Sequence, residues 1–419
     1  MRFEDLEIIK PILKALQDKN YIEPTTIQAK SIPLILKRND VLGSAQTGTG
    51  KTAAFAIPIL QHLYQDRTQL NGQRKIKALV ITPTRELAIQ IAESFTDYGK
   101  YTGIKNTVIF GGVNQGGQTN DLRRGVDVLV ATPGRLLDLI DQGFVNLNHI
   151  EYFVLDEADR MLDMGFIHDI RKIIHLLPIE RQSLFFSATM PDNIVELSKK
   201  ILKNPRKVEV SPVSSTADTI TQYLYYTNRS DKNDLLLHIL KHQKIDQVLL
   251  FSRTKHGADR IDNILKKQKI KSAAIHGDKA QNQRQKALSM FKDGELRVLV
   301  ATDIAARGID IAQLKYVINF DIPNIAETYV HRIGRSGRAG EEGTAISICE
   351  PEENVFIKDI EKLINQKIRI ARGNPFPQTD EPMNTAEKKE WEKEKQRRKQ
   401  EFFANQKKTG RPTLSRVRR

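Results

Sequence analysis

The amino-acid sequence predicts an α/β protein with two tandem domains, each a mostly parallel sheet covered by helices on both faces. Short apolar, β-rich runs alternate with amphipathic helical segments along most of the chain. Small polar residues from Ser211 to Thr216 interrupt this alternation once, as a linker would. The 419 residues also exceed what one ordinary core needs, so the length favours two domains.

Charge and cysteine content narrow the class of protein. Lys and Arg number 66 and Asp and Glu 51, and the net charge of +15 indicates a polyanionic partner or serves solubility. The single cysteine, Cys349, cannot form an internal disulfide, which is typical of a reducing compartment. The first five residues include two acids, whereas a secretory signal would begin with basic residues and continue with apolar ones. No apolar run approaches the length of a membrane-spanning helix. The sequence predicts a cytoplasmic protein with no membrane partner.

The first domain is predicted to span residues 1–210. Apolar residues recur at helical spacing over residues 3–16, and Pro24 precedes a second short helix. An apolar run at Val41 and Leu42 follows, and later strands are expected at 78–81, 107–110, 128–130, 153–155 and 184–186. Ligands of such sheets bind at the carboxyl ends of the strands.

The second domain is predicted over residues 218–370, after a linker at 211–217. Strands are expected at 223–226, 248–251, 273–275, 298–300, 317–320 and 345–348, with helices that include 258–267 and 284–291. Residues 371–419 form a tail in which 14 basic residues stand against 7 acidic ones. This tail is interpreted as partly disordered, and it either holds a polyanionic partner near the core or only adds solubility.

A glycine-rich stretch after the first apolar run predicts a phosphate-binding loop. Residues 45–52 read AQTGTGKT, between a strand and a helix, which is the context that such a loop requires. Gly48 and Gly50 let backbone N–H groups approach phosphate oxygens, Lys51 reaches the β- and γ-phosphates, and Thr52 offers a hydroxyl to Mg²⁺. Ala45 stands where the general pattern has glycine.

Two acids directly follow the strand predicted at 153–155. Asp156 is the candidate for the metal side and Glu157 for orienting the attacking water, as nucleotide hydrolysis requires. Alone, an acidic pair at a helix start often only complements the helix dipole. Next to a phosphate loop, the catalytic interpretation is favoured.

A long ordered series of motifs resembles one known family. The acidic tetrad 156–159 spells DEAD, and SAT follows at 187–189. Further matches are PTRELA at 83–88, Gly111-Gly112, TPGR at 132–135, FSRT at 251–254, Gln281 with Arg284, ATDIAARGID at 301–310 and HRIGRSGR at 331–338. Over residues 3–365 the chain is similar to the DEAD-box ATP-dependent RNA helicases of superfamily 2, closest to the bacterial RhlE-like branch. The resemblance implies two RecA-like domains, ATP and Mg²⁺ as cofactors, and RNA as the partner.

The resemblance also assigns nucleotide-binding residues. It implies that Phe3 stacks on the adenine and that Gln28 and Thr25 form the element that selects ATP, although an isolated Phe3 would more often be a core aromatic. Asn20 replaces a usual glycine of this element. The remaining implied nucleotide contacts are Gln46, Thr47, Gly48, Thr49, Gly50, Lys51, Thr52, Gly308 and Asp310.

Residues of the second domain are implied to complete the catalytic site. Arg335 and Arg338 resemble arginine fingers, whose planar donors suit charge on the γ-phosphate. They lie in another domain than Lys51, so the site is complete only when the domains close. Residues implied to couple the domains are Ser187, Thr189, His331 and Arg332.

The implied RNA contacts are donors that bind phosphates and sugars without reading bases. They are Pro83, Thr84, Arg85, Gly112, Thr132, Arg135, Arg253, Arg284 and Thr302. Individually, several of these residues could equally be helix caps.

The predicted function is an ATP-dependent RNA helicase that binds RNA without sequence preference, separates short duplexes when the domains close, and releases RNA after hydrolysis. Two alternatives remain: a DNA helicase or translocase of the same superfamily, and a non-catalytic RNA clamp locked by ATP. A monomeric core is expected, and ribonucleoprotein or ribosome-assembly components are candidate partners.

Overall fold

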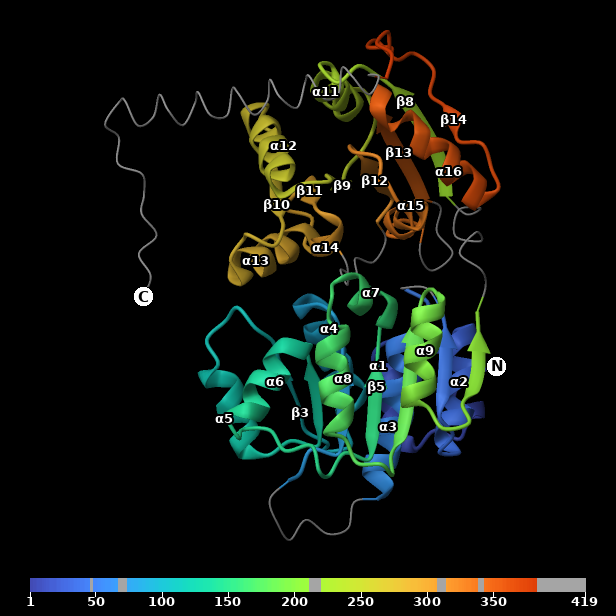
Figure 1. The fold of residues 1–419 in the computed structure, drawn as a ribbon, viewed down its shortest axis with the longest axis vertical. Helices are drawn as coiled ribbons and strands as arrows, with labels where there is room; N and C mark the ends of the chain where they lie inside the picture. Colours follow the sequence, from blue (N-terminus) through green and yellow to red (C-terminus); the bar gives the residue numbers. More distant parts are fainter. Residues whose placement is uncertain (46–47, 67–73, 211–219, 307–313, 338–342, 383–419) are drawn as a thin grey trace, which may run out of the picture.

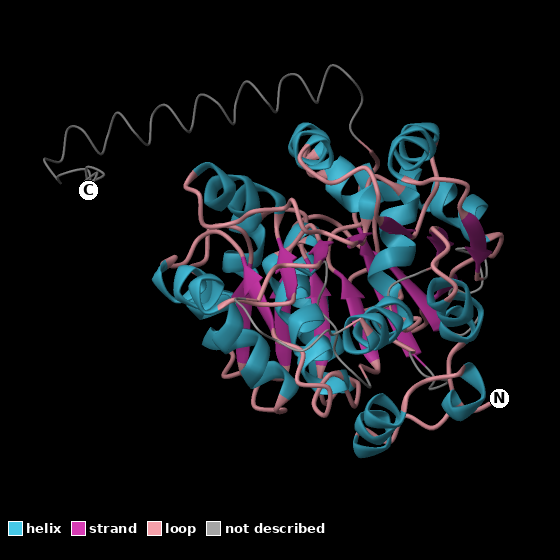
Figure 2. Cartoon of the chain, turned by 90° about the horizontal axis from the view of Figure 1, so that it is seen from below, coloured by secondary structure: helices cyan, strands magenta, loops and turns pink. Residues whose placement is uncertain are grey.

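Two parallel sheets flanked by helices form the two halves of the protein (Figures 1 and 2). The structure is a computed structural model that describes residues 1–45, 48–66, 74–210, 220–306, 314–337 and 343–382. Figure 1 shows α7 (Ala158–Asp163) of the first half facing α14 (Asp303–Ala306) and α15 (Ala326–Ile333) of the second. The predicted fold class is confirmed.

The first sheet contains seven parallel strands in the order β3-β4-β2-β5-β6-β1-β7. Their bounds are β1 Val41–Ser44, β2 Ala78–Ile81, β3 Asn106–Ile109, β4 Val128–Ala131, β5 Tyr152–Leu155, β6 Gln182–Ser187 and β7 Arg206–Glu209. Along β2, Ala78 and Val80 pack into one hydrophobic cluster. Leu79 and Ile81 pack into another, because successive side chains of a strand point to opposite faces. Both faces of this sheet are therefore buried, as its apolar runs predict.

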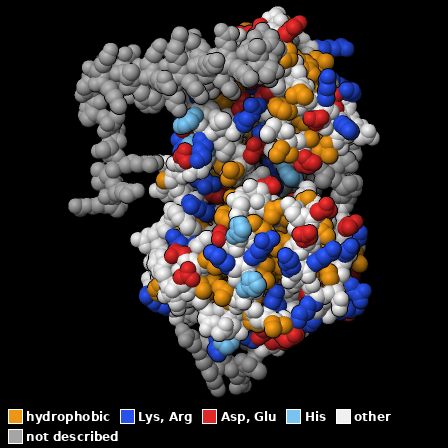
Figure 3. All heavy atoms as spheres, in the orientation of Figure 1, with side chains coloured by type: hydrophobic (Ala, Val, Ile, Leu, Met, Phe, Trp, Pro, Cys, Tyr) orange, Lys and Arg blue, Asp and Glu red, His pale blue; other side chains and the backbone are white. Residues whose placement is uncertain are grey.

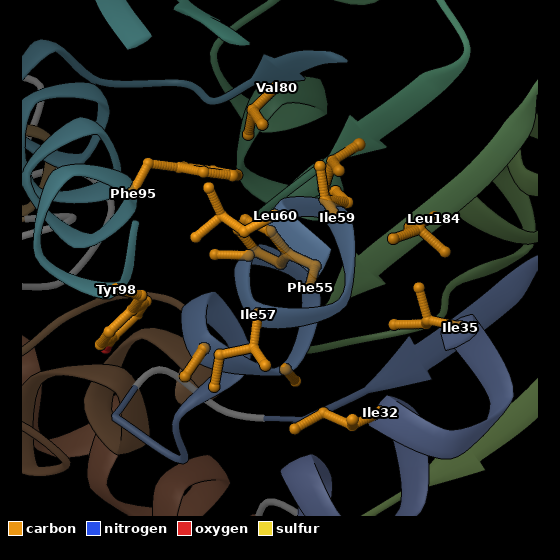
Figure 4. Close-up of a cluster of buried hydrophobic side chains, with 14 of the residues drawn as sticks. Ile32, Ile35, Phe55, Ile57, Ile59, Leu60, Val80, Phe95, Tyr98 and Leu184 are labelled. Carbon is orange, nitrogen blue, oxygen red and sulfur yellow. The ribbon is translucent and has the colours of Figure 1, made fainter. Parts of the chain in front are cut away.

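Helices cover both faces of the first sheet (Figure 2). They are the 3₁₀ helix η1 Phe3–Leu6 and the helices α1 Lys10–Asp18, α2 Thr26–Leu36, α3 Lys51–Gln65, α4 Arg85–Tyr98, α5 Gly116–Arg124, α6 Pro133–Asp141, α7, α8 Ile167–His175 and α9 Asp192–Ile201. Figure 4 shows Phe55 of α3 among the buried side chains of one core. Its ring centroid lies 5.6 Å from that of Phe186 on β6 and 6.3 Å from that of Phe95 on α4. Helix α3, which begins at Lys51, is thus fixed against the sheet.

The second sheet repeats the strand order of the first. Its order is β10-β11-β9-β12-β13-β8-β14, so β8 takes the place of β1 and β12 the place of β5. The bounds are β8 Ile220–Tyr226, β9 Val248–Phe251, β10 Ser272–Ile275, β11 Val298–Ala301, β12 Tyr316–Asn319, β13 Gly343–Cys349 and β14 Arg369–Ile370. The remaining elements are α11 Lys232–His242, α12 Lys255–Lys267, α13 Gln281–Lys292, α14, α15, η2 Pro351–Glu353 and α16 Asn354–Ile364.

The N-terminal segment differs from its prediction. Residues 3–16 are not one helix, because η1 ends at Leu6 and α1 begins at Lys10. Glu7 adopts a left-handed conformation with φ 57°, and Ile9 is extended before Pro11 in the first turn of α1. Proline fits the first turn of a helix but not its interior, so the chain has to restart there.

The first residues of the predicted tail pack against the second half. The backbone N–H of Ala371 donates to the Leu224 carbonyl over 2.9 Å, which continues the pairing of β14 with β8. Thr379 and Asp380 both donate their backbone N–H to the Asn228 side-chain oxygen, each over 2.9 Å. The described part of this segment is thus bound to the edge of the sheet, and residues 383–419 lie outside the described residues.

On the face seen in Figure 3, Lys and Arg side chains form a band across the middle of the first half, and acidic side chains lie mainly above and below this band. Among the described residues, no helix combines the length and the apolar character that a membrane span requires.

Candidate nucleotide and nucleic-acid site

The predicted phosphate loop connects β1 to the first residue of α3. Gly48 and Gly50 have φ of 86° and 92°, which favours glycine, and a Cβ on Gly50 would lie 2.3 Å from the Gln28 side-chain nitrogen. The Lys51 ammonium donates to the Ala45 carbonyl over 2.7 Å, so the lysine closes the loop on itself. The start of α3 adds the positive end of the helix dipole, and together these features form an anion site. Gln46 and Thr47 lie outside the described residues.

The element expected to bind adenine contacts this loop. Thr25 is the N-cap of α2, and its backbone N–H donates to the Gln28 side-chain oxygen over 2.8 Å. The Gln28 amide then donates to the Gly50 carbonyl over 3.1 Å. Because Gln28 is only 3% exposed, its orientation is fixed, and α2 is tied directly to the phosphate loop.

Phe3 lies in the hydrophobic core of the first half and is 3% exposed. Its backbone N–H donates to the Ile22 carbonyl over 3.4 Å. A ring enclosed by protein has no open face for a base. This packing matches the core-aromatic alternative, and the stacking role implied for Phe3 remains a prediction.

Asp156 and Glu157 follow β5 at its carboxyl end. Burial raises the pKa of Asp156 to about 6, and the neighbouring Lys51 ammonium opposes this rise. Glu157 adopts φ 57° and ψ 48°, a left-handed conformation that is unusual for a residue other than glycine. Such strained residues concentrate at functional sites.

Arg160 holds one oxygen of the Glu157 carboxylate. The guanidinium donates to Glu157 Oε1 over 2.6 Å, and both side chains are 3% exposed. Glu157 Oε2 is buried and accepts no hydrogen bond from the described residues. This second oxygen is the one that can accept a proton or orient a water molecule.

Asp159 links the acidic tetrad to the SAT segment. Its carboxylate accepts from Thr189 N over 2.9 Å and from the Thr189 hydroxyl over 3.0 Å. Its own backbone N–H donates to the Ser187 hydroxyl over 3.3 Å. Burial disfavours the charged form, but Lys51, Arg160 and Thr189 outweigh it and keep the pKa of Asp159 below its usual value. Ser187 and Thr189 are thus bound to the acidic tetrad within the first half, and their predicted role in coupling the domains remains a prediction.

The site fits a magnesium-bound nucleotide. Asp156 is 2% exposed and carries an anionic oxygen beside the phosphate loop, while Thr52 is the second residue of α3. No group of three or more His, Cys, Asp or Glu in the described part of the chain could hold a metal by itself. Mg²⁺ binds through one or two protein oxygens together with substrate phosphates and water, and Asp156 and Thr52 would supply such oxygens.

Two of the second-half residues lie beside this site. Arg335 and His331 bound a cavity between the halves that is also lined by Arg160. Arg335 is 5% exposed and its Nε donates to the His331 carbonyl over 3.3 Å. Gly308, Asp310 and Arg338 lie outside the described residues. The catalytic role of Arg335 and the coupling role of His331 remain predictions.

Arg332 is bound within its own half. Its guanidinium donates to both oxygens of Asp303, over 2.6 and 2.9 Å, and to the Asp321 carbonyl over 2.6 Å. It is 1% exposed and lies over the Phe251 ring at 5.1 Å. These contacts make Arg332 a structural link between α14, α15 and β12, and its predicted coupling role is untested.

A groove of about 510 Å³ brings together six of the nine predicted RNA contacts. These six are Pro83, Thr84, Arg85, Thr132, Arg135 and Arg284. The first five belong to the first half, whereas Arg284 belongs to α13 of the second. The groove therefore needs both halves.

The other three predicted RNA contacts have separate environments. Gly112 adjoins the groove, because a Cβ on it would lie 2.2 Å from Arg85 Nη1. Thr302 is 7% exposed at the end of β11. The Arg253 side chain is 44% exposed at the end of β9. Among the described residues that line the groove, neither Thr302 nor Arg253 is present.

Direct contacts join the halves at the groove. The Gln281 amide donates to Glu86 Oε1 over 2.8 Å, and Arg85 Nη1 donates to the Gln281 side-chain oxygen over 3.2 Å. Arg284 Nη2 lies 3.0 Å from Glu86 Oε1, with side chains 11% and 6% exposed. A buried ion pair thus connects two segments predicted to contact RNA.

Comparison with known proteins identifies the family. Residues 25–197 match the family model described as DEAD/DEAH box helicase, and residues 231–340 match the model described as Helicase conserved C-terminal domain. The DEAD-box ATP-dependent RNA helicase RhpA of Helicobacter pylori is 41% identical over 368 residues, covering 88% of this chain and 73% of RhpA. The chain belongs to the DEAD-box family of ATP-dependent RNA helicases.

Other relatives agree with this assignment. The DEAD-box ATP-dependent RNA helicase CshA of Geobacillus kaustophilus is 41% identical over 381 residues, covering 91% of this helicase and 80% of CshA. The solved structure of S. cerevisiae Dbp5 bound to RNA and ADP BeF3 aligns with a TM-score of 0.78 and 31% identity, covering 88% of this chain and 95% of that chain. The helicase is thus an RNA-stimulated ATPase with two RecA-like domains, as predicted.

Sequence reasoning missed several side chains of this helicase site. Glu86 and Asp159 lie inside matched motifs and Arg160 directly follows one, but the sequence alone assigned no role to these three residues. Asp303, which binds Arg332, had the same signal. Their partners come from other elements, so only the fold reveals what they contact.

The ion pair between Glu86 and Arg284 is expected to stabilise the closed arrangement. In a double-mutant cycle of Glu86→Gln and Arg284→Gln, the RNA affinity measured with a non-hydrolysable ATP analogue should show a coupling of about 0.5–3 kcal/mol. Lys286→Gln, an exposed residue of the same helix, serves as the control. Additive effects of the two substitutions would show that the pair does not form in the RNA-bound protein.

Proposed function

We propose that this helicase binds the RNA backbone, without reading bases, on a surface to which both halves contribute. The groove that joins Arg85 and Arg135 to Arg284 supports this proposal most directly. Guanidinium, hydroxyl and backbone N–H groups bind phosphates and sugars and carry no base preference. Arg284 lines this groove, and its Nε has no hydrogen-bond partner among the described residues.

We further propose that ATP and RNA favour the same closed arrangement. The nucleotide residues Lys51 and Gln28 belong to the first half, and Arg335 of the second half lies across a shared cavity from Arg160. ATP that contacts both halves therefore favours closure, and closure completes the RNA groove. Each ligand raises the affinity for the other by this linkage. We propose that closure bends the bound RNA strand, and because a bent strand cannot remain in a duplex, closure separates short helices locally.

The proposed hydrolytic site uses residues from both halves. Glu157 Oε2 orients the attacking water, because its other oxygen is already held by Arg160. Arg335 and Arg338 supply positive charge to the γ-phosphate, and Asp156 and Thr52 hold Mg²⁺. When bound, Mg²⁺ neutralises phosphate charge. Loss of the γ-phosphate then weakens closure, and RNA is released.

Comparing ATPase stimulation by RNA and by DNA of equal length and sequence tests this proposal. We expect RNA to stimulate turnover at least tenfold more than DNA. Equal stimulation would support a DNA helicase or translocase of the same superfamily. Multiple-turnover phosphate release separately excludes a clamp that uses ATP only to lock.

The finer predictions are proposed with this function. They are the domain bounds 1–210 and 218–370, the linker at 211–217, the basic tail at 371–419, a monomeric core, a cytoplasmic location, the RhlE-like branch and ribonucleoprotein or ribosome-assembly partners. The linker lies outside the described residues.

A further inference from the structure

The second half contains a lysine in the place that Lys51 occupies in the first. The two sheets share one strand order, and β8 stands where β1 stands. Lys51 is the first residue of α3, which follows β1. Lys232 is the first residue of α11, which follows β8. In the spatial order of the strands, β5 is fourth in the first sheet and β12 is fourth in the second. An acid follows each of these strands, Asp156 after β5 and Asp321 after β12.

The surroundings of Lys232 exclude a phosphate. The connection from β8 to α11, residues 227–231, contains no glycine and ends in Asp231, so its backbone cannot approach a phosphate as a glycine-rich loop does. The Lys232 ammonium lies 3.1 Å from Glu353, 3.3 Å from Asp321 and 3.5 Å from Glu350. Its side chain is 4% exposed. Carboxylates of this protein therefore surround the ammonium where phosphates would lie in the first half.

Two of these carboxylates, Glu353 and Asp321, also hold Arg253, a predicted RNA contact. Arg253 Nη2 donates to Glu353 Oε1 and, over 3.0 Å, to the Ile322 carbonyl. The Arg253 backbone N–H donates to Asp321 Oδ2 over 2.8 Å. Glu353 is 1% exposed, whereas the Arg253 side chain is 44% exposed. One guanidinium nitrogen is thus anchored in the interior while the side chain still reaches the surface.

Glu353 is itself fixed at both oxygens. Oε1 accepts the backbone N–H of Ile322 over 3.0 Å, and Oε2 accepts the backbone N–H of Glu350 over 3.1 Å as well as the Lys232 ammonium. Burial raises the pKa of Glu353, and Lys232 opposes this rise. For Lys232, burial favours the neutral form, but Glu353, Asp321 and Glu350 outweigh it and hold its pKa above the usual value. The lysine thus favours the charged form of the Glu353 carboxylate, which binds Arg253.

We propose that Lys232 and Glu353 are positioning residues for RNA binding, which set the guanidinium of Arg253 toward a backbone phosphate. The connection from β8 to Lys232 occupies the position that the phosphate loop has in the first half. In the second half, this position supports the contact of Arg253 with RNA and does not bind a second nucleotide. A rigid buried anchor lowers the entropy lost when Arg253 binds a phosphate, since only the outer part of its side chain remains to be ordered. This inference rests on the proposed function, because it assumes that Arg253 binds RNA.

A variant cycle in the full-length protein tests the inference, with a poly(U) oligonucleotide as the probe. Glu353→Gln keeps the shape of the side chain but removes its charge. We expect Glu353→Gln and Arg253→Gln each to raise the RNA concentration for half-maximal ATPase stimulation roughly tenfold. Each should also reduce the slope of log RNA affinity against log salt concentration by about one, the value for one lost phosphate contact. The double variant should resemble Arg253→Gln alone. Glu352→Gln in the same segment is the matched control, for which the RNA concentration for half-maximal stimulation, the KM for ATP and the RNA-independent ATPase rate should all remain at wild-type values.

Lys232 provides a second, independent test. Lys232→Met removes the charge and should weaken RNA binding in the same way, whereas Lys232→Arg should restore it. Thermal unfolding monitors the fold of each variant. If Glu353→Gln weakens RNA binding further in the Arg253→Gln background, or leaves RNA binding unchanged, the inference fails. If RNA does not stimulate the wild-type ATPase, the proposed function fails first.

Discussion

Replacing Lys51 with alanine is expected to abolish ATP turnover, lowering kcat/KM by roughly three orders of magnitude. The ammonium lies at the start of α3, 2.7 Å from the Ala45 carbonyl, where the loop and the helix dipole form an anion site. Alanine removes the charge that meets the β- and γ-phosphates while the glycine geometry of the loop remains. Steady-state phosphate release with saturating RNA measures the effect.

A matched control separates this loss from general damage. Lys207 is an exposed lysine on β7, the strand beside β1, and Lys207→Ala should retain wild-type turnover. Nucleotide binding, followed by a fluorescent ATP analogue, should also weaken in Lys51→Ala alone. A Lys51→Ala protein that hydrolyses ATP at the wild-type rate would refute the phosphate-loop assignment.

Replacing Glu157 with glutamine should separate binding from hydrolysis. The amide keeps the size of the side chain and its contact with Arg160, but it cannot accept a proton from water. We expect the hydrolysis rate to fall by about 10²- to 10⁴-fold, while ATP and RNA stay bound together, because closure does not require hydrolysis. Single-turnover hydrolysis and RNA dissociation in the presence of ATP measure the two effects.

Glu196→Gln, an exposed substitution on α9, is the control for this experiment. It should hydrolyse ATP and release RNA as the wild type does. Rapid RNA release from Glu157→Gln with ATP present would contradict the proposed link between hydrolysis and release. The trapped Glu157→Gln complex can also be crosslinked in cells, and sequencing its RNA would identify the natural substrates.

Central strands could be predicted from the sequence with good precision. The runs at 78–81 and 248–251 match β2 and β9 residue for residue, because strands buried on both faces are continuously apolar. The edge strands β7 and β14 were not predicted. In β7 only Val208 is buried, and both residues of β14 are exposed, so neither strand has an apolar pattern to detect.

The position of a residue within a motif did not reveal its contacts. The sequence marked Phe3 as the aromatic near the adenine, but packing in the core determines that its ring is enclosed. Likewise Arg332 pairs with Asp303, and Glu86 pairs with Arg284. These partners are far apart along the chain, and no local pattern encodes which side chains the fold brings together.

The sequence by itself determined the two α/β halves, the phosphate loop around Lys51 and the acids at the end of β5. These follow from local rules: apolar runs form strands, glycines permit a tight loop, and residues after parallel strands gather at one edge of the sheet. Only the tertiary structure decided that Arg160 binds one oxygen of Glu157, that the halves meet through Glu86, and that Glu353, which pairs with Lys232, holds Arg253. Such contacts depend on side chains that approach from separate elements, and their charges matter only once burial has removed water between them.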